Sequence, residues 1–216
     1  MEWQRQIDGY CERVGPEHWA EPLNAVSNLA FLLAAWVMWR RVRGQGMPLA
    51  VTLVVFLAGI GVGSSLLHTF ATVWAAAIDV AAIVGFILVY IFAINRDVWQ
   101  MRPLPALGLT VLFFPYAAAM IPVFGLIPGL GGSVGYAPVP LLILIYAVLL
   151  LQRAPQTATG MAIGAGILIV SILFRSLDEV LCEAIPRGTH FMWHILNGVM
   201  LGWMIEVYRR HLMTGR

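Results

Sequence analysis

Charged side chains are scarce in this sequence: they make up 11% of the 216 residues, and the formal net charge at pH 7 is only +2. Hydrophobic residues reach 60%, and the mean hydropathy is +0.83. A soluble domain of this length needs more charge on its surface than this. The few basic residues are scattered, which argues against a nucleic-acid-binding surface. The composition therefore predicts an integral membrane protein.

The first twenty residues lack the basic start and the apolar core of a cleavable signal peptide, and they carry several acidic side chains. We therefore expect the first membrane helix to direct insertion. No stretch has the composition of a soluble domain. Residues 125–137 form the one long connection, and their glycine and proline content predicts an irregular loop.

Seven apolar stretches are long enough to cross a bilayer as helices, although the fifth is short and flanked by proline. They predict an all-α integral membrane protein with a seven-transmembrane helix bundle. A single membrane domain would fill residues 1–216, with an outer N-terminal segment at 1–23, the bundle at 24–209 and a cytoplasmic tail at 210–216. The stretches are Asn24–Trp39, Pro48–Thr69, Thr72–Ile94, Leu104–Phe124, Pro138–Leu151, Thr157–Arg175 and Thr189–Tyr208.

The arginines indicate the orientation, because cytoplasmic loops of membrane proteins retain positive charge. With the N-terminus outside, nine arginines lie on the inner side and four on the outer side. We therefore predict an outer N-terminus and a cytoplasmic C-terminus, where outer means periplasmic, extracellular or lumenal. The inner arginines are Arg40, Arg41, Arg43, Arg96, Arg102, Arg153, Arg209, Arg210 and Arg216, and the outer ones are Arg5, Arg13, Arg175 and Arg187.

His68, Asp79, His190 and His194 are ionisable residues inside predicted spans, and all four converge at one depth near the outer side. Such residues are costly in a membrane and are candidates for a functional site. His190 and His194 are four residues apart, so both imidazoles project from one helical face. A histidine pair of this kind also occurs in ordinary helix packing, but a third histidine at the same depth completes a typical catalytic zinc site.

Ser64 lies one helical turn deeper than His68, on the same face. Its hydroxyl is a candidate donor to the oxyanion of a tetrahedral intermediate. Asp79 is a candidate proton acceptor for the attacking water and donor to the leaving group. A serine in a membrane helix also commonly bonds back to its own helix, which is the interpretation we prefer for Ser65.

Five separated motifs together resemble the signature of alkaline ceramidases. The central ones are Gly61-Val62-Gly63-Ser64-x-x-x-His68, Asp79 eleven residues later, and His190-x-x-x-His194. The resemblance extends to Glu21-x-x-Asn24-x-x-Ser27-Asn28 and to Asp178-x-x-x-Cys182-Glu183. Alkaline ceramidases are seven-helix zinc hydrolases of the CREST superfamily, which includes adiponectin-receptor relatives.

The resemblance implies a role for each residue of the cluster. His68, His190 and His194 would bind Zn²⁺, Ser64 would stabilise the oxyanion, and Asp79 would serve the proton transfers. The substrate would be the amide of ceramide, a membrane lipid that is released as sphingoid base and fatty acid.

Eukaryotic members of this family also hold a calcium ion near the N-terminus, and oxygen-rich clusters suit calcium. The resemblance makes Glu12 and Glu21 candidate Ca²⁺ ligands, with Asp8 as a substitute. Gly9 and Val14 stand where the family has an acid and an amide, so an acidic terminus without metal is the competing interpretation.

Cys11 and Cys182 are the only cysteines, and both fall on the predicted outer side. An oxidising compartment allows such cysteines to pair. The family places a bridge between matching cysteines, so the resemblance favours a disulfide over two free thiols.

Three functions fit these observations. The first is a zinc-dependent hydrolase of ceramide or another N-acyl lipid, and the second is a zinc-dependent lipid esterase with the same machinery. The third is a non-enzymatic heptahelical receptor or channel with a structural metal. An open zinc position among four converging ionisable residues argues against the third. Amide and ester hydrolysis pass through similar oxyanions, so the sequence does not separate the first two.

Overall fold

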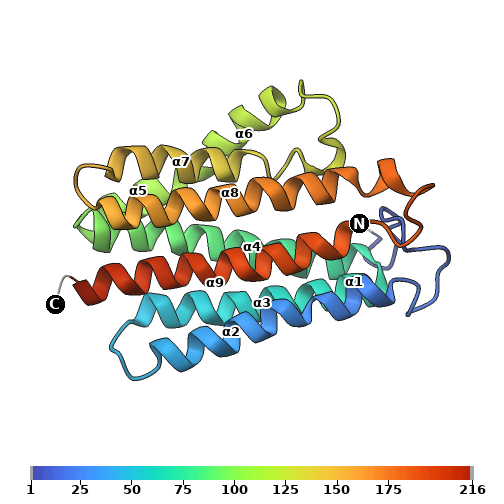
Figure 1. Cartoon of the computed structure of the whole chain (residues 1–216), viewed down its shortest axis with the longest axis horizontal. Helices are drawn as coiled ribbons and strands as arrows, with labels where there is room; N and C mark the ends of the chain where they lie inside the picture. The colour runs from blue at the N-terminus through green and yellow to red at the C-terminus, as the bar shows by residue number, and fades with distance from the viewer. Residues whose placement is uncertain (1, 215–216) are drawn as a thin grey trace.

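A computed structural model describes residues 2–214, which fold into an elongated bundle of roughly parallel and antiparallel helices (Figure 1). Arg216, one of the arginines counted above, lies outside the described residues. No β-strand occurs among residues 2–214, apart from one isolated bridge between Gln6 and Thr72. The predicted all-α class is confirmed.

Each of the seven predicted stretches coincides with one helix or with two consecutive helices. Short one-turn elements lie between some of them: the π-helix η1 (Ile94–Val98) and the 3-10 helices η2 (Gly131–Ser133) and η3 (Glu179–Leu181). The α-helices are α1 (Pro22–Ser27), α2 (Leu29–Val42), α3 (Pro48–Phe70), α4 (Val73–Ala93), α5 (Pro103–Val111), α6 (Phe113–Phe124), α7 (Pro138–Leu150), α8 (Pro155–Leu177) and α9 (His190–Thr214).

Five helical segments are long and apolar enough to cross a membrane: Pro22–Val42, Pro48–Phe70, Val73–Val98, Pro103–Phe124 and Pro155–Leu177. The other two segments differ from these in different ways. Helix α7 has only 13 residues. Helix α9 has 25 residues but carries several buried polar side chains, His190 and His194 among them.

Proline marks the start of most helices. It occupies the first helical position of α1, α3, α5, α7 and α8. Its fixed φ suits a helix start, and its missing N–H removes one of the donors that a first turn leaves unpaired. The sequence therefore fixes most helix starts locally.

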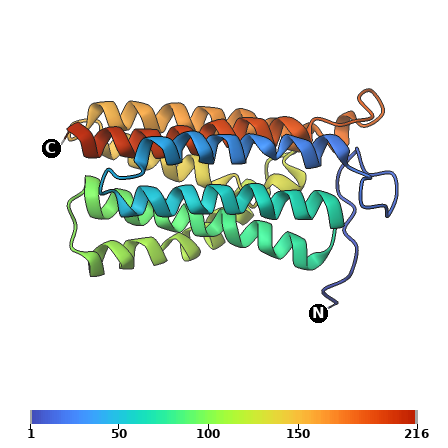
Figure 2. The same ribbon diagram turned by 90° about the horizontal axis from the view of Figure 1, so that it is seen from below.

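One end of the bundle collects the segments that matter for function, and we call it the site end. Helix α3 ends there, α1, α4 and α9 begin there, and the N-terminal segment and the α8–α9 connection lie over it (Figure 1 and Figure 2). The backbone of the N-terminal segment is tied to the α3–α4 turn, because Ile7 N–H donates to the carbonyl of Ala71 at 2.7 Å. The C-terminus lies at the opposite end.

Candidate metal centre

Three histidines meet at the site end. His68 comes from the last turn of α3, and His190 and His194 come from the first two turns of α9. One ligand atom from each lies within 4.8 Å of the others, and all three residues are 1% exposed. Among residues 2–214 this is the one group of three or more His, Cys, Asp or Glu side chains close enough to hold a metal ion. The structure thus brings together the three residues that the sequence singled out.

Hydrogen bonds leave ring nitrogens of this triad free. His68 Nδ1 lies 2.5 Å from Glu21 Oε2, and His194 Nδ1 lies 2.7 Å from Ser27 Oγ. Ser27 Oγ donates to the Asn24 carbonyl, so it accepts the proton of His194 Nδ1. In the neutral rings, the second nitrogens of His68 and His194 carry no proton and can act as metal ligands.

Two buried nitrogens in the triad lack any hydrogen-bond partner within the described chain: His190 Nδ1 and His194 Nε2. Buried polar atoms are almost always paired, so such orphan atoms need an explanation. A metal ion held by three neutral imidazoles supplies one. Three histidine ligands with an open position suit zinc.

Glu21 connects the triad to a buried arginine. Its Oε1 accepts from Arg13 Nε at 2.5 Å, while Oε2 faces His68 and also accepts from Asn24 Nδ2 at 3.2 Å. The Arg13 guanidinium also donates to the His68 carbonyl at 3.4 Å. Burial raises the pKa of the Glu21 carboxyl, but His68 and Arg13 outweigh it and hold that pKa below its usual range. Glu21 is therefore an ionised carboxylate that orients His68.

The structure gives no support to a calcium site in the N-terminal segment. The oxygens of Glu21 are bound to Arg13, His68 and Asn24, as described above. Both oxygens of Glu12 accept backbone N–H groups of Leu23 and Asn24 at 2.7 Å, so they cap the start of α1. Asp8 is exposed and, among the described residues, belongs to no group of close acidic side chains. The positive charge beside Glu21 is the Arg13 guanidinium.

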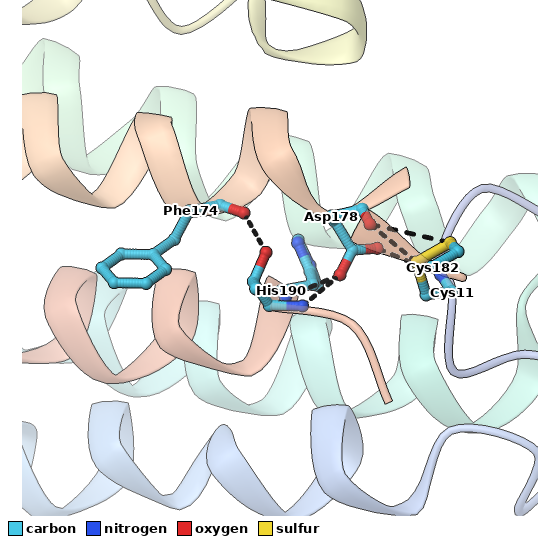
Figure 3. Close-up of a disulfide and its surroundings, with 6 residues drawn as sticks. Cys11, Phe174, Asp178, Cys182 and His190 are labelled. Atoms are coloured by element: carbon cyan, nitrogen blue, oxygen red, sulfur yellow. Dashed lines mark hydrogen bonds between the residues drawn. A yellow bond between two sulfur atoms is a disulfide. The ribbon is translucent and has the colours of Figure 1, made fainter. Parts of the chain in front are cut away.

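Cys11 and Cys182 form a disulfide, as the resemblance implied. Figure 3 shows Asp178 between this bridge and the start of α9. Asp178 Oδ2 accepts from Cys11 N–H at 3.0 Å, and Oδ1 accepts from His190 N–H at 2.8 Å. Gly188 makes this approach possible, because a Cβ there would lie 2.1 Å from Asp178 Oδ1 and its φ is +66°. The bridge and Asp178 therefore fix the turn of α9 that carries His190.

Aromatic rings cover the triad from the outside. Tyr10 stacks on His190 with ring centroids 3.9 Å apart, and burial raises the pKa of its hydroxyl to about 12. The Arg175 guanidinium lies 5.9 Å from the Tyr10 ring centroid, and it lies over Tyr136 and Trp193 at 5.1 and 5.7 Å. The N-terminal segment thus covers the triad through Tyr10, and Tyr136 of the 125–137 loop joins the rings around Arg175.

Asp79 and Ser64 are buried on neighbouring helices near the triad, with 7% and 4% exposure. Gly63 lets the two helices approach, because a Cβ on Gly63 would lie 3.0 Å from Asp79 Cα. Asp79 Oδ1 is buried without a hydrogen-bond partner among the described residues. Ser65 donates to the Gly61 carbonyl at 2.7 Å. The helix that packs against the Ser64 turn therefore carries a buried carboxylate oxygen without a partner.

An apolar cavity of about 80 Å³ continues from this cluster toward the opposite end. Ile60 and Ile83 line it one helical turn beyond Ser64 and Asp79, and Asn197 lines it just after His194. Tyr90 and Met204 lie at its far end. The lining of this cavity is largely apolar, which suits an aliphatic group.

Sequence reasoning missed several residues of this centre. The sequence indicates Glu21 only as part of a motif and as a candidate calcium ligand. It indicates Asn24, Ser27 and Asp178 only as parts of motifs, without a link to the histidines. The signal was present in the spacing Glu21-x-x-Asn24-x-x-Ser27, which places these side chains on one side of a helix start. Arg13 gave no signal beyond its sign of charge.

We expect Glu21→Gln to weaken zinc binding by about 10- to 100-fold, the usual effect of removing a carboxylate that orients a histidine ligand. The neutral amide holds the His68 tautomer less firmly and leaves Arg13 without its buried counter-charge. Zinc content after dialysis against a graded chelator series measures this. Glu12→Gln is the matched control, since Glu12 caps α1 and does not contact the triad. Equal zinc loss in both variants would contradict a specific role for Glu21.

A comparison with protein families finds that the family model described as Ceramidase matches residues 8–214, nearly the whole chain. The match covers the N-terminal segment from Asp8 onward, all the helices and every residue of the candidate centre. A comparison with curated proteins finds no match.

Proposed function

Since the chain belongs to the ceramidase family, whose members are hydrolases of amides, we propose that it is a membrane-embedded, zinc-dependent hydrolase of ceramide or a related N-acyl lipid. One observation carries the proposal. Three buried histidines, two of which have a ring nitrogen without a hydrogen-bond partner, form a group that can hold a metal ion, and the Oδ1 atom of the buried Asp79 also lacks a partner. The resemblance to alkaline ceramidases inferred from the sequence motifs is confirmed by the family match.

We propose that the protein crosses the membrane seven times as a single domain, with the bundle at residues 24–209. Five of the segments are apolar and long enough, and α7 and α9 pack between them against α8. The polar residues His190, His194, Asn197 and Glu206 of α9 are buried in the bundle, so they are compatible with a helix that crosses the membrane. The arginine distribution supports a site end that faces the outer side and a cytoplasmic C-terminus.

His68, His190 and His194 would hold the zinc ion. When bound, such an ion polarises the scissile carbonyl and acidifies a water molecule. The protein's contribution is to orient the ligands: Glu21 and Ser27 fix the ring tautomers of His68 and His194, and Asp178 fixes the start of α9. The aromatic cover keeps the site dry, which strengthens every electrostatic interaction in it.

Asp79 is the proposed proton carrier. Its unpartnered Oδ1 accepts a proton from the attacking water as the new C–O bond forms, and it returns that proton to the nitrogen as the C–N bond breaks. The products are a free fatty acid and an amine. The Ser64 hydroxyl donates a hydrogen bond to the oxygen that becomes negative in between.

The apolar cavity is the proposed site of an aliphatic chain of the substrate, and Tyr90 closes its far end. Tyr90 lies about 16 Å beyond Asp79 along α4, at ~1.5 Å per residue. A second, smaller apolar cavity of about 30 Å³ is lined by Tyr90, Ile94, Leu142 and Met161. Tyr90 and Ile143 line both cavities, and Tyr90 is the proposed limit to the length of the chain that fits.

We expect Tyr90→Ala to join the two cavities and to shift the preference toward longer chains, on the order of 10-fold in relative kcat/KM. A ladder of N-acyl substrates of increasing chain length, presented in competition, measures the shift. Tyr90→Phe keeps the ring and serves as the control with an unchanged profile. An unchanged profile in Tyr90→Ala would mean that the chain leaves the bundle before reaching Tyr90.

Mass spectrometry of host lipids incubated with the purified protein tests the proposed function. We expect N-acyl lipids to decrease while free fatty acids and amine products accumulate, and we expect zinc chelation to stop this. Cleavage of esters with intact amides would favour the lipid esterase. Failure to cleave any lipid with zinc bound would favour the receptor or channel.

A further inference from the structure

The largest cavity described in the structure is not at the triad. It is a groove of about 720 Å³ between α8 and α9, at the end of the bundle opposite to the site end. The groove is bounded by the first turns of α8 and the last turns of α9. None of the residues of the proposed hydrolase lines it, so its ligand is independent of the proposed reaction.

The groove is basic. Arg153, Arg210 and His211 line it, and no acidic residue does. Two carboxylates lie close to these groups. Glu206 has oxygens 2.8 to 3.3 Å from guanidinium nitrogens of Arg41, Arg209 and Arg210, and Asp97 acts electrostatically on His211 and lies 3.7 Å from Arg96 Nε. Each carboxylate is paired with at least one arginine outside the groove, so the groove remains basic.

The part of the groove that lies toward the middle of the bundle is apolar. Ile163, Trp203 and Val207 line it, and Ile163 is 47% exposed. The indole N–H of Trp203 is bound to the Gly160 carbonyl at 2.7 Å, which holds the ring against α8. Along α9 the lining therefore changes from apolar at Trp203 to charged at Arg210, toward the end of the helix.

A directed hydrogen-bond donor lies where the two parts meet. Thr157 Oγ1 and His211 Nδ1 are 2.9 Å apart, so this contact fixes the orientation of the imidazole. If the threonine hydroxyl donates to Nδ1, the Nε2 of the neutral ring carries the proton and donates elsewhere. This donor and the two arginines suit a phosphate group.

We propose that the groove binds an anionic phospholipid of the surrounding membrane. Its phosphate lies against Arg153, Arg210 and His211, and one acyl chain lies along Ile163 and Trp203. A soluble anion would leave the apolar lining uncovered, and a lipid without net charge would leave the surplus positive charge unpaired. Basic grooves between membrane helices are suited to anionic headgroups.

Binding of defined lipids to the full-length protein in detergent tests this proposal. Native mass spectrometry should show that phosphatidylglycerol binds more tightly than phosphatidylcholine with the same acyl chains. Thr159→Glu places an acid in the groove at an exposed position, and we expect it to weaken phosphatidylglycerol binding about fivefold or more, the effect of one charge near a headgroup.

Thr52→Glu is the matched control. Thr52 bonds to the carbonyl of Pro48 at 3.0 Å as Thr159 bonds to that of Pro155 at 2.9 Å, each in the first turns of a 23-residue helix at the same end of the bundle. Thr52 does not line the groove. We expect this variant to bind phosphatidylglycerol like the unmodified protein.

Three results would overturn the proposal: equal affinity for the two lipids, equal weakening by Thr52→Glu and Thr159→Glu, or full competition by soluble glycerol phosphate. The last result would indicate a site for a soluble anion. The assay requires no hydrolysis, so a catalytically inactive protein that still binds phosphatidylglycerol would contradict the proposed function alone.

Discussion

Replacement of any one of His68, His190 and His194 by alanine is expected to remove most of the zinc and all measurable lipid hydrolysis. Two imidazoles cannot hold the ion as three do, and the buried site offers no other ligand in the described chain at the same distance. Loss of a ligand should exceed the ~100-fold effect of losing a residue that orients one. Metal analysis of the purified variants measures this directly.

His18→Ala is the control for this experiment. His18 is exposed and does not belong to the triad. Its ring packs edge-on against Phe70, with ring centroids 5.1 Å apart. We expect about one zinc per chain in this variant, as in the unmodified protein. Retention of zinc in a variant of one triad residue would remove that residue from the ligand set.

The positions of these histidines could be predicted because they depend only on helix geometry. Long apolar stretches define where each helix crosses, and the helical rise then places His68, Asp79 and His190 at one depth. The spacing of His190 and His194 needs no tertiary information at all. The fold class and the centre of the site are therefore recoverable from the sequence.

The residues around the triad could not be predicted in the same way, because they belong to irregular segments. Glu21 reaches His68 from the N-terminal segment, and Asp178 reaches His190 across a turn that requires Gly188. Neither contact follows from a periodic pattern. Arg13 shows what the sequence does not reveal. Its positive charge helped to predict the topology, but the structure buries Arg13 as the counter-charge of Glu21.

Helix α9 shows why apolar composition alone misjudges a membrane segment. His190, His194, Asn197 and Glu206 lower its apolarity, yet all four are buried in the bundle. Asn197 donates to Ser171 Oγ at 2.9 Å, and Glu206 is bound by arginines. A helix at the centre of such a bundle meets protein on most sides, so it tolerates polar residues that a lipid-facing helix does not.

Asp79→Asn is expected to keep the fold and most of the zinc while lowering turnover by about 10²- to 10⁴-fold, the usual contribution of a positioned acid–base group. The amide is almost the same size as the carboxylate, and because Asp79 Oδ1 has no hydrogen-bond partner, the substitution breaks no contact there. What the amide cannot do is accept the proton of the attacking water. The loss should therefore appear in kcat more than in KM.

Asp97→Asn makes the same chemical change far from the triad, where Asp97 accepts a hydrogen bond from the Tyr208 hydroxyl. We expect this control to retain full turnover. Zinc content and thermal unfolding of both variants separate the two explanations for a slow Asp79→Asn enzyme. If zinc is lost, Asp79 belongs with the ligands; if zinc is retained and turnover is normal, the proton acceptor is another group. Only retained zinc with slow turnover agrees with Asp79 as the group that carries the proton from water to the leaving nitrogen.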